Sequence, residues 1–159
     1  MSGATPVEML EAEHRVIQKI VAGMSVLAEQ LEDGEPVDVS LLESIVVFLR
    51  TFADRCHHGK EETFLFPALI RRGVPSHGCP IGGLTMEHQK GRVMVGELAE
   101  AIRGCAAGEP PARENLVKSL RALVAFYPSH IWKEDYLPAI PAGRQGSHSA
   151  RPTRADGQV

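Results

Sequence analysis

The sequence has few aromatic residues, few cysteines and no long hydrophobic run. Phe, Trp and Tyr make up 5% of the 159 residues. No apolar stretch approaches the roughly 20 residues that a membrane-spanning helix needs, so we expect no membrane partner. The three cysteines, Cys56, Cys79 and Cys105, are an odd number, which is wrong for a disulfide framework and typical of a reducing compartment. Since the N-terminal residues also lack the basic start and apolar core of a signal peptide, we place the protein in the cytoplasm.

An excess of charge of either sign is also missing. A net charge of −3 argues against nucleic acid as the main partner. A hydrophobic fraction of 43% with 23% charged residues is ordinary for a globular protein and excludes disorder throughout. We expect one folded domain over residues 1–140. Residues 141–159 are rich in Gly, Ser, Arg and Pro without periodicity, which predicts a disordered tail.

Hydrophobic residues recur at alternating steps of three and four, which predicts four helices and no strand. The first helix begins at a capping box formed by Thr5 and Glu8, and its apolar stripe runs from Val7 to Leu31. The second begins near Asp38, and Pro67 is expected to kink or end it before Gly73. The other two stripes run from Ile81 to Cys105 and from Leu116 to Leu137. Four such helices with short connections predict an all-α, antiparallel up-down-up-down four-helix bundle.

Histidines interrupt three of the four apolar stripes in strict register, at His14, His88 and His130. A buried imidazole must find a partner or cost free energy. Glu134 lies four positions after His130, so both side chains project from one face of a helix. The second helix carries the same pattern, because His57-His58-Gly59-Lys60-Glu61 and His130-Ile131-Trp132-Lys133-Glu134 both read His-x-x-Lys-Glu.

The two halves of the chain match at longer range as well, which indicates an internal two-helix repeat. Each half has a Glu-His pair, at Glu13-His14 and Glu87-His88, followed by a His-x-x-Lys-Glu word at a nearly constant distance. In an antiparallel bundle these positions meet at one end. Buried together, the imidazoles and carboxylates need a cation, and their number exceeds one tetrahedral zinc site. The pattern predicts two metal ions bridged by the two carboxylates, with six ligands: His14, His57, Glu61, His88, His130 and Glu134.

Several neighbouring residues are weaker candidates. His57 continues the apolar stripe, so we prefer it to His58, and we prefer Glu61 to Glu62 in the same way. Tyr127 lies one turn before His130 and is either a hydrogen-bond donor at the site or an ordinary core tyrosine. His77 lies in the connecting loop and is either a substitute fifth imidazole or a solvated loop residue.

Residues adjacent to the predicted ligands point about 100° away around an α-helix. We therefore expect no ligation by Cys56. Glu13 and Glu87 are expected to be exposed carboxylates, with acceptance of a hydrogen bond from a ligand histidine as the alternative. Cys79 is the better candidate for a redox-active thiol, although an inert loop cysteine is the ordinary interpretation.

This pattern resembles the hemerythrin-like (HHE cation-binding) family over roughly residues 5–140. The resemblance is carried by His14, by His57-x-x-x-Glu61, by His88 and by His130-x-x-x-Glu134, and also by Leu65-Phe66-Pro67 and Gly91-Arg92. It implies a four-helix bundle that holds two non-haem iron ions, bridged by two carboxylates and an oxo or hydroxo group.

Two departures from the oxygen-carrying members affect the expected function. Those proteins have a second histidine four residues after the one on the third helix, where this chain has Arg92. On the fourth helix they have an aspartate five residues after the histidine, whereas the candidate carboxylate of this chain is Glu134, four residues after His130. The resemblance then implies reaction with oxygen, hydrogen peroxide or nitric oxide, as in catalase-like peroxide decomposition or a redox response under oxidative stress. The alternative is a metal-dependent oxygen or iron sensor, or an iron-storage or donor module, without turnover.

Overall fold

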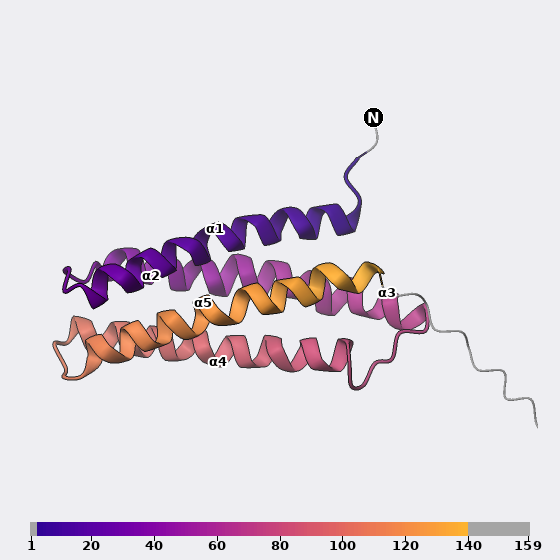
Figure 1. Cartoon of the computed structure of the whole chain (residues 1–159). Coiled ribbons are helices and arrows are strands. Elements are labelled where there is room, and N and C mark those ends of the chain that lie inside the picture. Colours follow the sequence, from indigo (N-terminus) through magenta and orange to yellow (C-terminus); the bar gives the residue numbers. More distant parts are fainter. Residues whose placement is uncertain (1–2, 140–159) are drawn as a thin grey trace, which may run out of the picture.

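The computed structural model describes residues 3–139, and all regular structure within them is helical, with no strand. The predicted tail over residues 141–159 lies outside the described residues. None of the described helices is both long and apolar enough to cross a membrane. Figure 1 shows long helical segments lying side by side. In chain order the elements are α1 (Pro6–Glu32), α2 (Val39–Phe48), η1 (Leu49–His58), η2 (Glu61–Leu65), α3 (Phe66–Arg71), α4 (Ile81–Ala106), α5 (Ala112–Tyr136) and η3 (Leu137–Ala139).

The first two helices begin where the sequence predicts. The Thr5 hydroxyl accepts a hydrogen bond from the Glu8 N–H at 3.2 Å, and the Glu8 carboxylate accepts one from the Thr5 N–H at 2.7 Å. Asp38 caps α2 by accepting from the Leu41 N–H at 3.0 Å. Each cap satisfies a backbone donor that has no partner inside the helix.

The predicted second helix is an unbroken helical segment from α2 to α3, but its middle is not α-helical. η1 and η2 are π-helical, with only Gly59 and Lys60 between them. Pro67 lies in the first turn of α3 and does not end the segment, which stays helical although proline donates no backbone hydrogen bond. The helix ends at Arg71, and Gly73 follows with a φ of +93°, which favours glycine.

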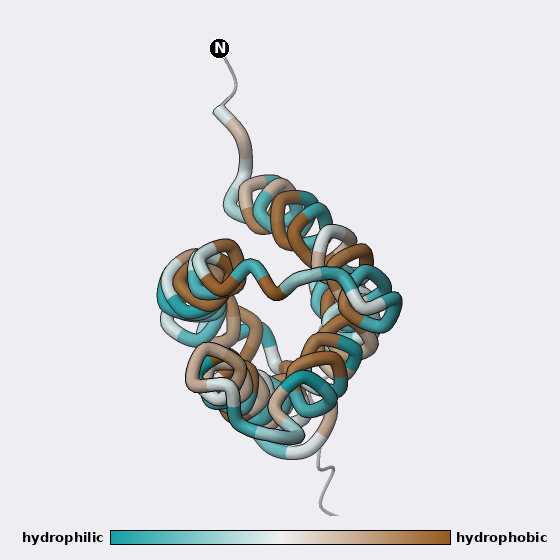
Figure 2. The backbone as a smooth tube through the Cα atoms, turned by 90° about the vertical axis from the view of Figure 1, so that its left-hand side faces the viewer, coloured by the Kyte–Doolittle hydropathy of each residue, from teal (hydrophilic) through white to brown (hydrophobic). Residues whose placement is uncertain are grey.

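The buried side chains follow the predicted stripes, and the helices are grouped around a common axis when viewed along their length (Figure 2). The larger apolar cluster extends from Ile17 and Leu31 of α1 to Leu116 and Ile131 of α5. A smaller one is formed by Phe66, Leu69, Val74, Ile81, Leu84 and Leu137. Along α4 and α5, His88 and Glu134 lie between residues of the two clusters, so a polar layer separates two apolar ones.

Candidate metal centre

The polar layer consists of seven ionisable side chains, each no more than 3% exposed. They come from α1, η1, η2, α4 and α5: His14, His57, His58, Glu61, His88, His130 and Glu134. Such groups are rarely buried unless they are paired with one another or bind a metal ion. This layer is therefore where the molecule departs most from an ordinary helical core.

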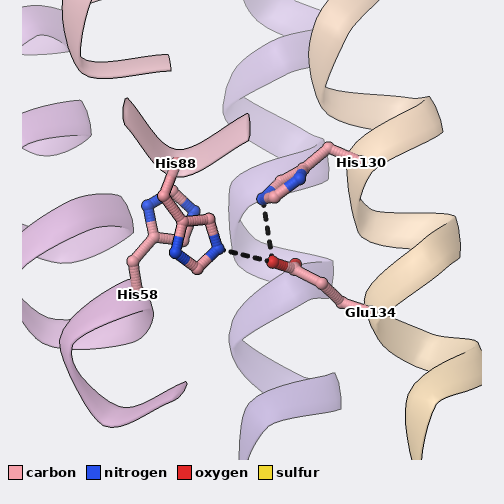
Figure 3. Close-up of side chains that lie close together, drawn as sticks. All are labelled: His58, His88, His130 and Glu134. Atoms are coloured by element: carbon pink, nitrogen blue, oxygen red, sulfur yellow. Dashed lines mark hydrogen bonds and ion pairs between the residues drawn. The ribbon is translucent and has the colours of Figure 1, made fainter. Parts of the chain in front are cut away.

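The seven side chains form two clusters that share Glu134. The two-histidine cluster contains His14, His57, Glu61 and Glu134, and the three-histidine cluster contains His58, His88, His130 and Glu134. Within each cluster the potential ligand atoms lie within 4.8 Å of one another. Figure 3 shows the imidazoles of the three-histidine cluster gathered around the carboxylate of Glu134.

Both buried carboxylates lie between the clusters. One oxygen of Glu134, Oε1, lies 2.8 Å from His130 Nε2 and 2.9 Å from His88 Nε2, whereas Oε2 lies 3.1 Å from His14 Nε2. Oε1 of Glu61 lies 3.5 Å from His57 Nε2, and its Oε2 lies 3.4 Å from His88 Nε2. Each carboxylate thus turns one oxygen toward each cluster.

Every histidine of the layer is oriented by a different carboxylate outside it. Each Nδ1–H donates to its own acceptor: His14 to Asp135 at 2.6 Å, His57 to Glu13 at 2.9 Å, His58 to Asp54 at 3.2 Å, His88 to Glu62 at 2.7 Å and His130 to Glu87 at 2.9 Å. Because an ionised carboxylate only accepts hydrogen bonds, each Nδ1 carries a proton and each Nε2 is the nitrogen that faces the two buried glutamates. Carboxylates in this position typically fix the tautomer and the orientation of metal-binding histidines.

Basic residues hold four of these five carboxylates. Lys60 contacts Glu13, and Lys133 contacts Glu87. Arg92 reaches two of them, with its Nη2 2.8 Å from Asp54 and 2.9 Å from Glu62.

The guanidinium and the neighbouring imidazole also keep Asp54 ionised. Partial burial opposes ionisation, but the hydrogen bonds from His58 and Arg92 lower the pKa of Asp54 to about 2. The carboxylate that orients His58 therefore remains a hydrogen-bond acceptor at neutral pH.

The layer has more buried polar atoms than its own hydrogen bonds can satisfy. Among residues 3–139, six buried atoms have no hydrogen-bond partner: Nε2 of His14, His57 and His130, both oxygens of Glu61 and Oε2 of Glu134. Burial raises the pKa of Glu61 to about 7. Burial opposes ionisation of Glu134 too, but the imidazoles of His130, His14 and His88 hold its pKa well below its usual range. Unpartnered inward nitrogens and oxygens are the donor set that a cation requires, so these residues fit a metal centre.

The six predicted ligands all lie in the two clusters, and His58 lies there with them. His57 and His58 were treated as alternatives because adjacent side chains diverge by about 100° on an α-helix. η1 is π-helical, and its wider turn rotates successive side chains by less. Both rings consequently face the core, with centroids 5.7 Å apart, and His58 stacks on His88 at 3.9 Å.

The weaker candidates take different positions. Glu62 is not in either cluster but accepts the hydrogen bond from His88. Tyr127 is buried beside His58, in the wall of a pocket. His77 is exposed in the loop before α4 and lies outside both clusters. Cys56 and Cys79 are exposed and free.

Sequence reasoning predicted the carboxylates that orient the histidines only in part, because it gave the orienting role of Glu13 and Glu87 as the less favoured alternative. The expectation that Glu13 and Glu87 are exposed was wrong, because both are partly buried and accept hydrogen bonds from His57 and His130. Asp135 was not considered, although it follows Glu134 as Glu62 follows Glu61. Extending the internal repeat by one residue would have found it. Asp54, four positions before His58, has no counterpart in the repeat that would have pointed to it.

A helical bundle with imidazoles and carboxylates projecting into one buried layer defines a class of non-haem metal-binding proteins. Within this class, residues 5–140 match the family model described as the hemerythrin HHE cation binding domain, and the chain belongs to that family. Domains of this family bind metal ions, typically iron, and the histidine–glutamate clusters fit this property.

Three curated proteins are similar to the chain in sequence. Proteins named as uncharacterized in two strains of Mycobacterium tuberculosis and one strain of Mycobacterium bovis are 27% identical over 138 residues, which cover 86% of this chain and 53% of each relative. The chain thus spans about half the length of the curated relatives it matches. No solved structure matches it significantly.

Proposed function

We propose that the chain is a di-iron protein built on an antiparallel up-down-up-down four-helix bundle. In this proposal His14 and His57 bind one iron, His58, His88 and His130 bind the other, and Glu61 and Glu134 are shared. The observation that carries it is that each buried carboxylate turns one oxygen toward each cluster. The bundle topology is supported by residues from early in α1 and α4 meeting residues from late in the second helical segment and α5.

The donor set favours two redox-active ions over one zinc. Structural zinc is almost always bound by four ligands, whereas the layer offers five imidazole nitrogens and two carboxylates. Imidazole suits iron, copper, nickel and zinc, and carboxylate suits harder ions, so a mixed set of this size suits a pair of iron ions. The six unpartnered buried atoms argue that the layer is built for such ions rather than for a metal-free core.

We infer that the loaded centre reacts with oxygen, hydrogen peroxide or nitric oxide. Bound iron would supply the redox change and open coordination positions for such a small molecule. The protein's residues keep the two ions together through the shared carboxylates. The carboxylates on Nδ1 increase the basicity of the imidazoles. The apolar layers on both sides, with Phe66 and Leu84 on one and Ile17 and Ile131 on the other, exclude bulk water.

Metal content and the optical spectrum of protein purified without a chelator test this proposal. We expect two iron ions per chain and near-ultraviolet absorption typical of a bridged iron pair. Release of oxygen on addition of hydrogen peroxide would support catalase-like turnover. Spectral change without oxygen release would favour the sensor or iron-storage alternative. One zinc ion, or a well-folded protein without metal, would contradict the di-iron assignment.

A variant pair sharpens the measurement. Glu61→Ala removes a carboxylate that faces both clusters, so both ions should bind more weakly. His77→Ala removes an exposed imidazole of the loop and should leave the metal content unchanged. Equal metal content in wild type and Glu61→Ala would show that Glu61 does not bridge.

A further inference from the structure

The two clusters of the polar layer differ in how firmly their histidines are held. Four of the five carboxylates that orient the histidines contact a basic side chain, but within residues 3–139 Asp135, the acceptor for His14, contacts none. The side chain of Asp135 is also the most exposed of the five, at 43%, whereas the other four range from 15% to 33%. Water can therefore compete for the hydrogen bond that fixes the imidazole of His14.

The beginning of α1 covers His14 with little apolar packing. Only Leu10 is buried among residues 6–13 of α1, and it belongs to neither apolar cluster. The larger cluster includes α1 only from Ile17 onward, and the smaller cluster, over the part of the chain that the structure describes, contains no residue of α1. In Figures 1 and 2 the beginning of α1 diverges from the rest of the bundle. The first two turns of α1 can thus move at a small cost in apolar contacts.

A small hollow lies under these two turns. Its walls include Val7 and Leu10 of α1 together with His14, Glu61 and Glu134 of the two-histidine cluster. The volume of the hollow is about 10 Å³, which is space for about one water molecule, so the cluster is closed in this conformation. Because Val7 and Leu10 form part of the wall, movement of the first turns of α1 opens the cluster to solvent.

The three-histidine cluster lies beside a larger opening but holds its ligands more firmly. A pocket of about 170 Å³ reaches His58. Three imidazoles belong to this cluster instead of two, and the carboxylates that orient His58 and His88 are both held by Arg92. Each further oriented imidazole adds a bond to the ion, and support of that imidazole strengthens the bond. Access alone therefore does not decide which ion leaves first, and we expect the two-histidine cluster to lose its ion first.

We propose that the two-histidine cluster is an exchange site, which takes up and releases one divalent iron ion past the first two turns of α1. His14 is the ligand that detaches, with Asp135 as its positioning residue, while the three-histidine cluster retains its own ion. The inference rests on the proposed di-iron function, since both positions must be filled. It goes further by assigning one of the two positions to the transfer of iron to a chelating acceptor, and by naming the route.

Release of iron to a chelator tests the exchange site. Iron-loaded protein is reduced with dithionite in the absence of oxygen and mixed with excess ferrozine, whose coloured ferrous complex reports the amount and the rate of release. We expect two phases of one iron ion per chain each. The rates should differ by at least about tenfold, because support of ligand histidines typically changes metal affinity by this factor or more. The readout is transfer of the ion itself and requires no turnover.

The internal repeat offers a matched pair of variants that assigns each phase to a cluster. Asp135→Asn keeps a hydrogen-bond acceptor for His14 but removes its charge, so it should accelerate the fast phase about three- to tenfold and leave the slow phase unchanged. Glu62→Gln makes the same change behind His88 and should accelerate the slow phase alone. Acceleration of the slow phase by Asp135→Asn would overturn the assignment of the exchange site.

Leu10→Ala tests the route past α1. It weakens the packing of the first turns without removing a candidate ligand, so the fast phase should become about three- to tenfold faster while the slow phase stays the same. Val16→Ala shortens an exposed side chain of the same helix and should match wild type. A fast phase that is unchanged in Leu10→Ala would overturn the route.

Iron content measured before mixing separates the possible failures. Two iron ions per chain that leave in a single phase would overturn the exchange site and leave the di-iron proposal standing. A wild-type protein that binds no metal would overturn both. Two phases, of which Asp135→Asn and Leu10→Ala accelerate only the fast one, would support the inference.

Discussion

The two halves of the chain supply nearly the same residues to the buried layer. Each contributes a Glu-His pair and a His-x-x-Lys-Glu word, and the contacts match as well as the letters. In the first half Lys60 contacts Glu13, which accepts from His57. In the second half Lys133 contacts Glu87, which accepts from His130. The repeat therefore encodes the hydrogen bonds behind the histidines along with the histidines themselves.

The halves also exchange contacts in a symmetric way. The acidic residue after each shared carboxylate accepts from the first histidine of the opposite half, so that Asp135 binds His14 and Glu62 binds His88. This reciprocity places the two halves face to face across the layer. Neither half can complete its own set of oriented imidazoles without the other.

The correspondence between the two halves is lost at three residues that contact one another beside the three-histidine cluster. Where the first half has Asp54 and His58, the repeat places Tyr127 and Ile131 in the second, and where the second half has Arg92, the first has Gln18. Asp54, His58 and Arg92 contact one another in series and lie beside the same pocket. The asymmetry thus adds an imidazole to one cluster and leaves a polar pocket beside it. Substitutions that remove shared parts, or make one half copy the other, test this comparison.

Removal of a shared carboxylate should have the largest effect. Glu134→Ala takes away a carboxylate that belongs to both clusters of the described residues, so we expect both metal ions to bind at least about tenfold more weakly. The thermal midpoint of the loaded protein should fall, because metal affinity contributes to folding stability. Metal content after dialysis and thermal denaturation measure both effects. Glu114→Ala, at an exposed position of α5, is the control. Retention of both ions in Glu134→Ala would contradict the proposal that Glu134 binds both of them.

His58→Ile should come next, because it gives the first half the residue found at Ile131 in the second. The three-histidine cluster loses a ligand, whereas the two-histidine cluster keeps all of its members. We expect metal content to fall toward one ion per chain, as measured by elemental analysis after gel filtration. His77→Ile places the same change on the exposed loop and should retain both ions. Full metal content in His58→Ile would mean that the fifth imidazole is not a ligand.

Arg92→Gln should act more weakly, because it copies Gln18 and leaves every candidate ligand in place. It removes the guanidinium that holds both Asp54 and Glu62, and so loosens His58 and His88. Loss of a carboxylate that orients a ligand histidine typically weakens metal binding about 10- to 100-fold, and Arg92 acts only through such carboxylates, so we expect a loss of at most about tenfold, on one side only. Competition with a metal-binding dye measures the affinities. Arg103→Gln removes an exposed ion pair from the same helix and should leave the metal affinity of both clusters unchanged. An equal loss of affinity at both clusters would contradict a role of Arg92 confined to the three-histidine cluster.

The sequence predicted the helices and the convergence of the six candidate ligands in one layer because both follow the α-helical period. Steps of three and four locate every buried position of α1, and His14 lies in that series. The capping residues Thr5 and Asp38 could be identified because their chemistry is local. These are the features that depend on neighbours along the chain.

The features that could not be predicted depend on departures from the α-helical period or on long side chains that contact a neighbouring helix. The π-helical turns of η1 bring His58 beside His57, and nothing in the local residue types indicates where such a turn forms. Glu13 lies off the apolar stripe, but its side chain is long enough to contact His57 and Lys60 on another helical segment. An assignment by stripe alone treats such a residue as exposed.

The smallest effects should come from the two lysines, where the halves are equivalent. Lys60→Met and Lys133→Met each remove one ion pair from a carboxylate that orients a histidine. Both lysines are more than a third exposed, so each change should cost about 0.5 kcal/mol of unfolding free energy, and the two costs should be equal. Chemical denaturation of the loaded single and double variants measures this, with exposed Lys90→Met on α4 as the control. Because the two sites share no partner, the costs should add. A clear difference between the single variants would place the asymmetry of the centre beyond Asp54, His58 and Arg92.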